Sequence, residues 1–126
     1  MAENNHFEII KTEEVYKGYA FSVDVDEVRS NSGLVFERSV VKHPRSVVIL
    51  PLDDQDNMVL VKQYRHPAKI HLLEAPAGKL EGGELPADCA QRELQEEIGY
   101  KSSNLKLLTE FYVSPGYSTE YMYAYL

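Results

Sequence analysis

The chain has 126 residues, enough for one domain with a buried core and too few for two independent domains. Its apolar fraction of 44% and charged fraction of 26% are ordinary for a globular protein, and its net charge of −7 argues against a nucleic-acid partner, because no basic stripe is present to neutralise phosphates. The single cysteine excludes an intramolecular disulfide and favours a reducing cytoplasm, and no run reaches the roughly 18 apolar residues of a membrane helix, so no membrane partner is expected.

The first third of the chain is rich in strand signals. Residues 7–42 contain alternating apolar and polar positions, as at Phe21, Val23 and Val25, and residues 31–33 (Asn-Ser-Gly) are a turn signal between two strands. We therefore expect an N-terminal β arm over residues 1–42 and a main domain over residues 43–126.

The middle and the end of the chain predict further strands. Residues 46–52 (SVVILPL) form a continuous apolar run suited to a buried strand, and residues 58–65 (MVLVKQYR) are expected to be its partner. Residues 71–78 (HLLEAPAG) lead into a glycine-containing loop. Strands are also expected over residues 105–113 and 121–126, on either side of a loop at residues 114–120. With one helix among these strands, the predicted fold class is α+β.

That helix is predicted between Pro86 and Gly99. Proline suits the first helical turn, and glycine suits the left-handed residue that follows the last turn. Between them, apolar residues recur at spacings of three and four, which predicts one buried stripe made of Ala87, Ala90, Leu94 and Ile98.

Three glutamates, Glu93, Glu96 and Glu97, fall on the arc beside this stripe. Like charges at this spacing cost a few tenths of a kcal/mol per pair, and a divalent cation would turn that cost into a gain. Oxygen-only ligands favour Mg²⁺ or Mn²⁺ over zinc, and such a site suits attack of a metal-activated water on phosphorus. The alternative is an ordinary solvated helix face.

The window from Gly78 to Tyr100 resembles the Nudix box, a signature of enzymes that cleave nucleoside diphosphates linked to another group. The residues that match its fixed positions are Gly78, Glu84, Arg92, Glu93, Leu94, Glu96, Glu97 and Gly99, with Tyr100 where an aliphatic residue is commoner. The resemblance favours metal binding over the solvated face. It also implies the Nudix α/β/α sandwich, with a mixed sheet and the box helix.

The resemblance implies roles for individual residues. Glu93 and Glu97 would be the main metal ligands, with Glu96 sharing the cluster. The carbonyl of Ala77 would complete the metal shell. Arg92 would orient the glutamates through an ion pair with Glu84.

Two further positions of the box segment can be interpreted from their residue type. The missing side chain of Gly78 would let the backbone approach a ligand. Cys89 is interpreted as a small packing residue.

Residues outside the box resemble the ADP-ribose pyrophosphatase branch of the family. Pro115 lies fifteen residues beyond Tyr100, within a loop of sequence SPGYSTE, and LLEAPAGK and VKQYRHP also match the branch. The resemblance covers residues 34–126 and implies Mg²⁺-dependent hydrolysis of ADP-ribose to AMP and ribose 5-phosphate. The alternatives are hydrolysis of a GDP- or UDP-sugar, and a module that binds ADP-ribose without cleaving it.

The branch also suggests which residues contact substrate. Arg65 would lie near the diphosphate, and Arg38 would also contact substrate, although either could be an ordinary surface arginine. Pro115 and Glu120 are further candidates for the binding site. Arg45 departs from the branch, which often has glycine at this position.

Aromatic residues of the arm could stack on the base. In alternating strands, however, such rings are more often part of a core. The rings available in the arm are Tyr16, Tyr19, Phe21 and Phe36.

Branch members commonly continue beyond the position of Leu126, with a loop that carries a catalytic glutamate. We therefore expect this chain to be a fragment, in which Glu96 or Glu120 would have to act as the general base. The resemblance also implies a homodimer, with the β arm of residues 1–42 at its interface and in contact with the substrate base.

Overall fold

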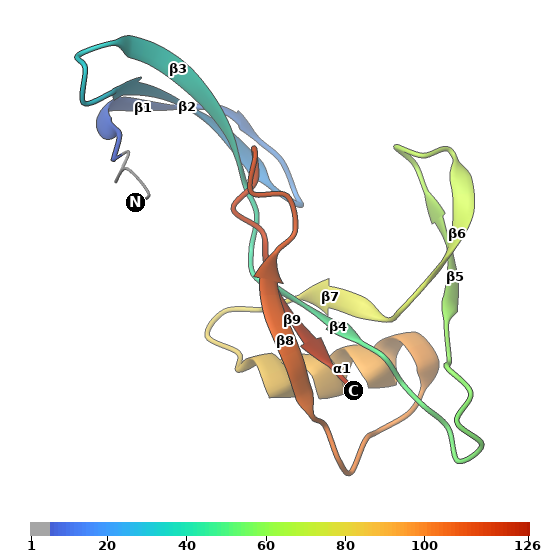
Figure 1. The fold of residues 1–126 in the computed structure, drawn as a ribbon. Helices are drawn as coiled ribbons and strands as arrows, with labels where there is room; N and C mark the ends of the chain where they lie inside the picture. Colours follow the sequence, from blue (N-terminus) through green and yellow to red (C-terminus); the bar gives the residue numbers. More distant parts are fainter. Residues whose placement is uncertain (1–5) are drawn as a thin grey trace. The chain divides into compact units, whose positions relative to one another are not determined.

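The computed structural model describes residues 6–126. Its elements in chain order are β1 (Glu8–Lys17), β2 (Ser22–Arg29), β3 (Val35–Lys42), β4 (Ser46–Ile49), β5 (Val61–Arg65), β6 (Ile70–Glu74), β7 (Ala77–Lys79), α1 (Pro86–Ile98), β8 (Leu107–Tyr112) and β9 (Tyr121–Tyr125) (Figure 1). They fall into two compact units. Of the described residues, the first unit contains 6–44 and Val113–Glu120, and the second contains Arg45–Tyr112 and Tyr121–Leu126.

The first unit is built on an antiparallel sheet of order β1-β2-β3. The predicted turn at residues 31–33 joins β2 to β3, where Gly33 takes a positive φ of 84° that a side chain would disfavour. Every residue of β1 is exposed, whereas β2, in the middle of the sheet, buries Asp24 and Val28. The expected strands of the arm are therefore present, and the edge strand β1 is uncovered.

The segment between β8 and β9 is bonded to strand β3 of this unit. The N–H of Val41 donates to the carbonyl of Tyr117 at 2.7 Å, and the N–H of Thr119 donates to the carbonyl of Val41 at 2.9 Å. The hydroxyl of Thr119 also accepts a bond from the N–H of His43 at 3.0 Å. The predicted loop at 114–120 is thus fixed by backbone pairing.

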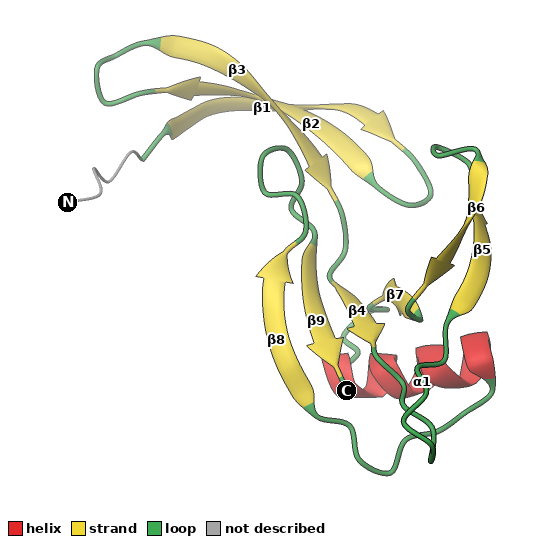
Figure 2. Ribbon diagram, turned by 45° about the vertical axis from the view of Figure 1, so that its right-hand side comes forward, coloured by secondary structure: helices red, strands yellow, loops and turns green. Residues whose placement is uncertain are grey.

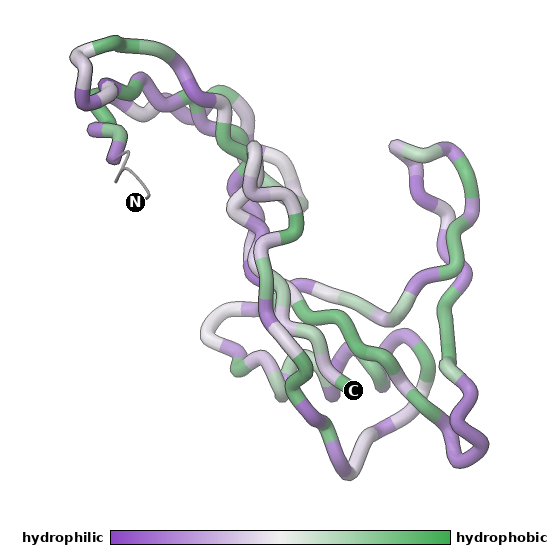
Figure 3. Tube along the Cα trace, viewed as in Figure 1, coloured by the Kyte–Doolittle hydropathy of each residue, from purple (hydrophilic) through white to green (hydrophobic). Residues whose placement is uncertain are grey.

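The second unit contains a mixed sheet of order β7-β4-β9-β8 with α1 packed against it (Figure 2). Strand β4 runs parallel to β9 and antiparallel to β7. The apolar run that contains β4 (Figure 3) supplies two core residues, Val47 and Ile49, which are almost fully buried. Burial of each such side chain stabilises the fold by about 1.5–3 kcal/mol. The remaining buried members of the core are Cys89, Ala90, Leu94 and Tyr125.

The expected pairing of residues 58–65 with 46–52 is wrong. Strand β5 instead pairs with β6 in a separate hairpin, and residues 52 and 58 share only an isolated bridge. The reason is that β4 already has β7 on one side and β9 on the other, so neither of its edges is free. The residues before the box, expected only as a lead-in to the loop, supply β6 and β7.

The α+β class is confirmed, since residues 6–126 contain one helix and otherwise strands. The second helical layer of the expected sandwich is not found in this described part of the chain. Within the same residues, no helix is both long and apolar enough to cross a membrane.

Candidate active site

Helix α1 begins and ends where the sequence predicts. Pro86 occupies its first turn, and Gly99 closes it in a left-handed conformation with φ 73° and ψ 15°. The predicted buried stripe is displaced, because the helix buries Cys89, Ala90, Glu93 and Leu94, while Ala87 is exposed. At about 100° per residue, this places the buried arc between Ala90 and Glu93, with Ala87 at its margin. One acidic side chain therefore faces the sheet, and Cys89 packs in the core as expected.

Arg92 is the centre of the polar cluster on this helix. Its Nε donates to Oε1 of Glu84 at 2.8 Å and its Nη2 donates to Oε2 at 2.9 Å, the predicted ion pair in bidentate form. Nη1 reaches Glu93 at 2.9 Å and Glu96 at 3.3 Å. Nη2 also donates to the carbonyl of Lys79 at 3.0 Å. One guanidinium thus joins the helix to the loop before it.

The electrostatics follow from these bonds. The hydrogen bonds from Arg92 and from the N–H of Glu81 lower the pKa of Glu84 to about 2. The same pairing with Glu84 raises the pKa of Arg92, so the guanidinium stays charged at every ordinary pH. Burial raises the pKa of the Cys89 thiol to about 12, which leaves it protonated and unreactive.

Glu93 lies against the backbone of β7. A side chain at Gly78 would overlap its carboxylate, so only glycine leaves room for Glu93 in this position. Glu93 is only 8% exposed. Burial raises its pKa, and the hydrogen bond and charge of Arg92 offset only part of that shift.

Glu97, one helical turn further along, accepts a hydrogen bond from the N–H of Ala77 at 3.2 Å. Burial raises the pKa of Glu97 too, and the bond from Ala77 opposes that shift. The structure thus brings Glu93 and Glu97 against the backbone of residues 77 and 78, and Glu93, Glu97 and Ala77 are three of the four residues that the resemblance assigned to the metal. Glu96 is more exposed on the same helix.

These residues fit a hard divalent cation. Arg92 is the shared partner of Glu81, Glu84, Glu93 and Glu96, so negative charge exceeds positive charge around it. Glu93 and Glu97 are the two carboxylates whose charged form is disfavoured, and a nearby cation would favour it. All of the donors are oxygens, as Mg²⁺ and Mn²⁺ prefer. Among residues 6–126, no three His, Cys, Asp or Glu residues are already grouped as a metal site, so a bound ion would require these side chains to converge.

The remaining predicted site residues divide between the two units. Arg65 belongs to the second unit, where Glu74 on the neighbouring strand binds it. Arg38, Pro115 and Glu120 belong to the first. The guanidinium of Arg38 lies 4.3 Å from the centre of the Phe36 ring, and Glu120 lies 3.7 Å from Nδ1 of His43.

The aromatic side chains of the arm are expected to be part of a core, and for three of them this expectation is wrong. Tyr16, Tyr19 and Phe21 are exposed, because strand β1 and the turn after it are not covered by another element in the described chain. Phe36 is partly buried and packs edge to face against Phe7, with ring centres 5.3 Å apart.

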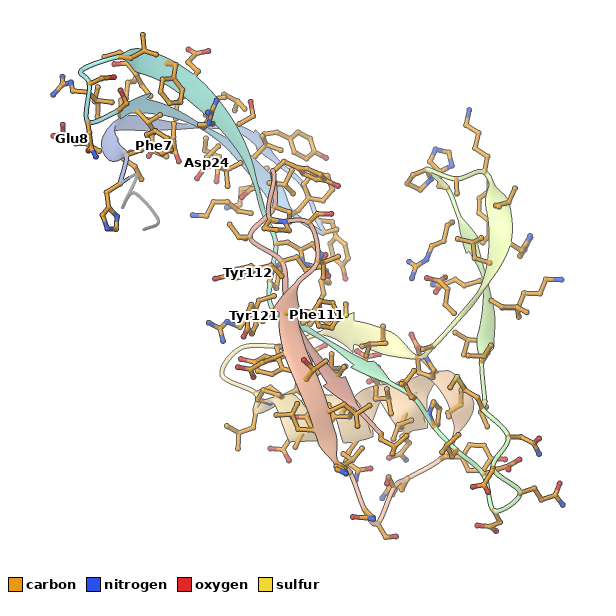
Figure 4. The ribbon with its side chains drawn as sticks, viewed as in Figure 1. Phe7, Glu8, Asp24, Phe111, Tyr112 and Tyr121 are labelled. Carbon is orange, nitrogen blue, oxygen red and sulfur yellow. The ribbon has the colours of Figure 1, made fainter. Side chains whose placement is uncertain are left out.

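Two residues of the second unit have contacts that the sequence did not indicate. Arg45 lies 5.1 Å from the centre of the Tyr121 ring and donates to the hydroxyl of Tyr123. Tyr121 also packs edge to face against Tyr112, at 4.9 Å (Figure 4). The second is Glu74, the partner of Arg65. In the sequence, Glu74 is an isolated glutamate after an apolar pair, with no distinctive spacing to Arg65.

The Glu84–Arg92 pair makes stability depend on pH in a defined window. Because the pKa of folded Glu84 lies below its ordinary value of 4.5, the folded chain binds fewer protons there than the unfolded chain. The stabilisation is complete above pH 4.5 and is lost as the pH falls towards 2. We expect Glu84→Gln to lower the free energy of unfolding at pH 7, and to lower it by less at pH 3, as measured by urea unfolding.

The matched control for this experiment is Glu81→Gln. Glu81 lies 3.7 Å from Arg92 with its side chain 76% exposed, so its loss should change stability little at either pH. A stability difference between wild type and Glu84→Gln that is equal at pH 7 and pH 3 would contradict the assignment.

Comparison with known proteins shows which family the chain resembles. The NUDIX domain model matches residues 42–126. The chain is 39% identical over 117 residues to an ADP-ribose pyrophosphatase of Bacillus subtilis (strain 168), covering 93% of this chain and 63% of that protein. It is 40% identical over 127 residues to an ADP-ribose pyrophosphatase of Mycobacterium tuberculosis, covering 100% and 61%. A protein described as a methanol dehydrogenase activator of Bacillus methanolicus is 38% identical over 117 residues, covering 93% and 63%.

The fold has a close counterpart among solved structures. The crystal structure of an ADP compounds hydrolase superposes with a TM-score of 0.87 at 23% identity, covering 99% of this chain and 68% of that one. The chain spans about three fifths of the length of the curated relatives named above. Since the family model matches most of the chain, the chain belongs to the NUDIX domain family.

Proposed function

We propose that the protein hydrolyses the diphosphate of ADP-ribose to AMP and ribose 5-phosphate, with Mg²⁺ at Glu93 and Glu97. The observation that carries the proposal is the buried carboxylate of Glu93 against Gly78 and the half-buried carboxylate of Glu97 at Ala77, beside an arginine that binds both Glu93 and Glu84. Two relatives named ADP-ribose pyrophosphatase support this choice of substrate.

The roles of the side chains follow from their contacts. A bound Mg²⁺ would neutralise the diphosphate oxygens and lower the pKa of a bound water. Arg92 holds Glu93 and Glu96 in orientation, and Gly78 keeps space free for Glu93. Arg65 is our candidate for a direct contact to the diphosphate.

For the general base we propose Glu96 rather than Glu120. Glu96 lies on the same helix as Glu93 and Glu97, and its side chain is 58% exposed, so it can accept a proton from a water. Glu96→Gln should lower kcat and flatten the acidic limb of the pH–rate profile, while the Mg²⁺ concentration for half-maximal rate stays unchanged.

A substrate panel tests the reaction. With Mg²⁺, the chain should release AMP from ADP-ribose faster than it cleaves GDP-mannose or a UDP-sugar, as followed by chromatography of the nucleotides. A preference for a GDP- or UDP-sugar would replace the substrate and keep the reaction class. Binding of ADP-ribose without cleavage of any member of the panel would support the non-catalytic alternative instead.

The metal ligands are tested by Glu97→Gln. If Glu97 binds Mg²⁺, removal of its charge should lower Mg²⁺-dependent turnover by about a thousandfold, because several kcal/mol of charge stabilisation are lost. The midpoint temperature of thermal unfolding should change by only a few degrees. Turnover at the wild-type rate would exclude Glu97 as a ligand.

Two glycine variants test the same site from the backbone side. Gly78→Ala should displace Glu93 and lower turnover about a hundredfold, since small misplacements of catalytic groups have effects of that size. Gly82→Ala is the matched control, because a side chain there meets nothing within 4 Å. Equal losses in the two variants would argue against a specific role for the Gly78 position.

We also propose a homodimer formed through the β arm. The arm exposes an extensive set of apolar side chains, which an assembly would cover. They are Phe7, Ile9, Ile10, Val15, Tyr16, Tyr19, Phe21, Leu34 and Val35.

Light scattering at micromolar concentration should give a dimer for the wild type and a monomer for Ile9→Asp, because a charge at this exposed apolar position would oppose association. Glu14→Gln on the same strand should remain a dimer. A monomeric wild type would contradict the proposal.

A further inference from the structure

The β5–β6 hairpin holds a bidentate ion pair. Nε of Arg65 donates to Oε2 of Glu74 at 2.8 Å and to Oε1 at 3.1 Å, and Nη2 donates to Oε1 at 3.0 Å. Three bonds between two side chains fix the plane of the guanidinium as well as its position. Arg65 is therefore oriented by one residue.

The register of the hairpin shows that this contact is long-range along the strands. Arg65 pairs with Ile70 and Glu74 pairs with Val61, so the two positions lie four residues apart on the ladder. That separation is about 13 Å at roughly 3.3 Å per residue. Both side chains lie on the same face, because alternate residues of a strand share a face. The Arg65 side chain consequently folds back along the hairpin towards the end where Glu74 lies.

That end of the hairpin leads directly into the candidate active site. Glu74 is the last residue of β6. Ala77 is the first residue of β7, three positions later, and its N–H donates to Glu97. The chain therefore leads from the ion pair directly to the strand whose backbone contacts Glu97.

Glu74 leaves one edge of the guanidinium available. Arginine carries five N–H groups, and Glu74 uses the one on Nε and one on Nη2. The other three, on Nη1 and Nη2, form an edge that can bind two oxygens of a phosphate. Within residues 6–126, this edge has no acceptor, and the side chain of Arg65 is 45% exposed.

We propose that Glu74 is a positioning residue for the hydrolysis. It holds Arg65 folded back along the hairpin, with the free guanidinium edge presented to the diphosphate of the substrate. This inference rests on the proposed function for the reaction itself, but the geometry of the pair can be tested without turnover.

The kinetic test is a double-mutant cycle on ADP-ribose hydrolysis. Arg65→Ala and Glu74→Ala should each lower kcat/KM, the latter by about ten- to a hundredfold, as expected when a catalytic contact is misplaced. The double variant should be no worse than Arg65→Ala alone, because Glu74 acts only through Arg65. Glu74→Gln should give an intermediate loss, because its amide oxygen can still accept from the guanidinium.

The matched control is His71→Ala on the same strand. His71 packs against Tyr64 across the hairpin, with ring centres 5.4 Å apart, and has no contact with the ion pair. If Glu74 only stabilised the hairpin, His71→Ala should lower kcat/KM in the same way. We expect instead a change of less than about twofold. Multiplicative losses in the Arg65–Glu74 double variant would overturn the proposal.

Two measurements are independent of turnover. In a ¹⁵N NMR spectrum of the arginine side chains, the Nε–H of Arg65 should be protected from exchange in the wild type and lose that protection in Glu74→Ala. Calorimetric binding of magnesium pyrophosphate should weaken in Arg65→Ala and in Glu74→Ala, with no further loss in the double variant. Unchanged protection or unchanged pyrophosphate binding in Glu74→Ala would overturn the proposal.

These measurements separate the two hypotheses. If the wild type cleaves no member of the nucleotide panel, but both single variants bind pyrophosphate more weakly and the double variant follows Arg65→Ala, the proposed reaction fails. Positioning of Arg65 for a diphosphate would then still hold.

Discussion

The geometry of the candidate site depends on one guanidinium. Arg92 is fixed between Glu84 in the preceding loop and the carbonyl of Lys79 at the end of β7, and from there it reaches Glu93 and Glu96. Without the positive charge of Arg92, the carboxylates of Glu93 and Glu96 would repel each other on a partly buried helix face. A lysine could replace the charge but not the planar fork that contacts several acceptors at once. The box therefore contains both the glutamates of the site and the arginine whose ion pairs hold them in place.

The second requirement is close packing between helix and sheet. The carboxylate of Glu93 can lie against β7 because Gly78 has no side chain there, and β7 itself is held by backbone pairing with β4. Val47 and Ile49 on β4 pack against Ala90 and Leu94 in the same core. The residues that bury the helix therefore also set the distance between its glutamates and the backbone of β7. A substitution that loosens the packing of this core should therefore also change the position of the glutamates.

The sequence predicted the parts of the structure that depend on local chemistry. Pro86 and Gly99 delimit the helix because each suits a terminal conformation, and the Glu84–Arg92 pair was predicted from the family motif. Pairing between distant strands was less predictable. Residues 58–65 are predicted to pair with the strand at residues 46–52 because the two apolar runs follow each other in the chain. Periodicity does not show that β7 and β9 occupy both edges of that strand. The exposure of Ala87 likewise depends on how the helix is rotated against the sheet.

The same limit explains why Glu74 was missed. An isolated glutamate at the end of an apolar run has no distinctive spacing, and its role emerges only once the hairpin register brings it to Arg65. Tyr16, Tyr19 and Phe21 show the converse error, since an alternating pattern indicates two faces but does not show that both are covered.

The environment of Cys89 has a consequence for chemical reactivity. The thiol lies on the buried face of α1 and donates weakly to the carbonyl of Lys79. Burial raises its pKa to about 12, so almost no thiolate exists in the native state. In an unfolded chain the same sulfur would return to its ordinary acidity and become open to alkylation. The only cysteine of the sequence is therefore an intrinsic reporter, because the rate at which an alkylating reagent modifies it measures how often the helix separates from the sheet.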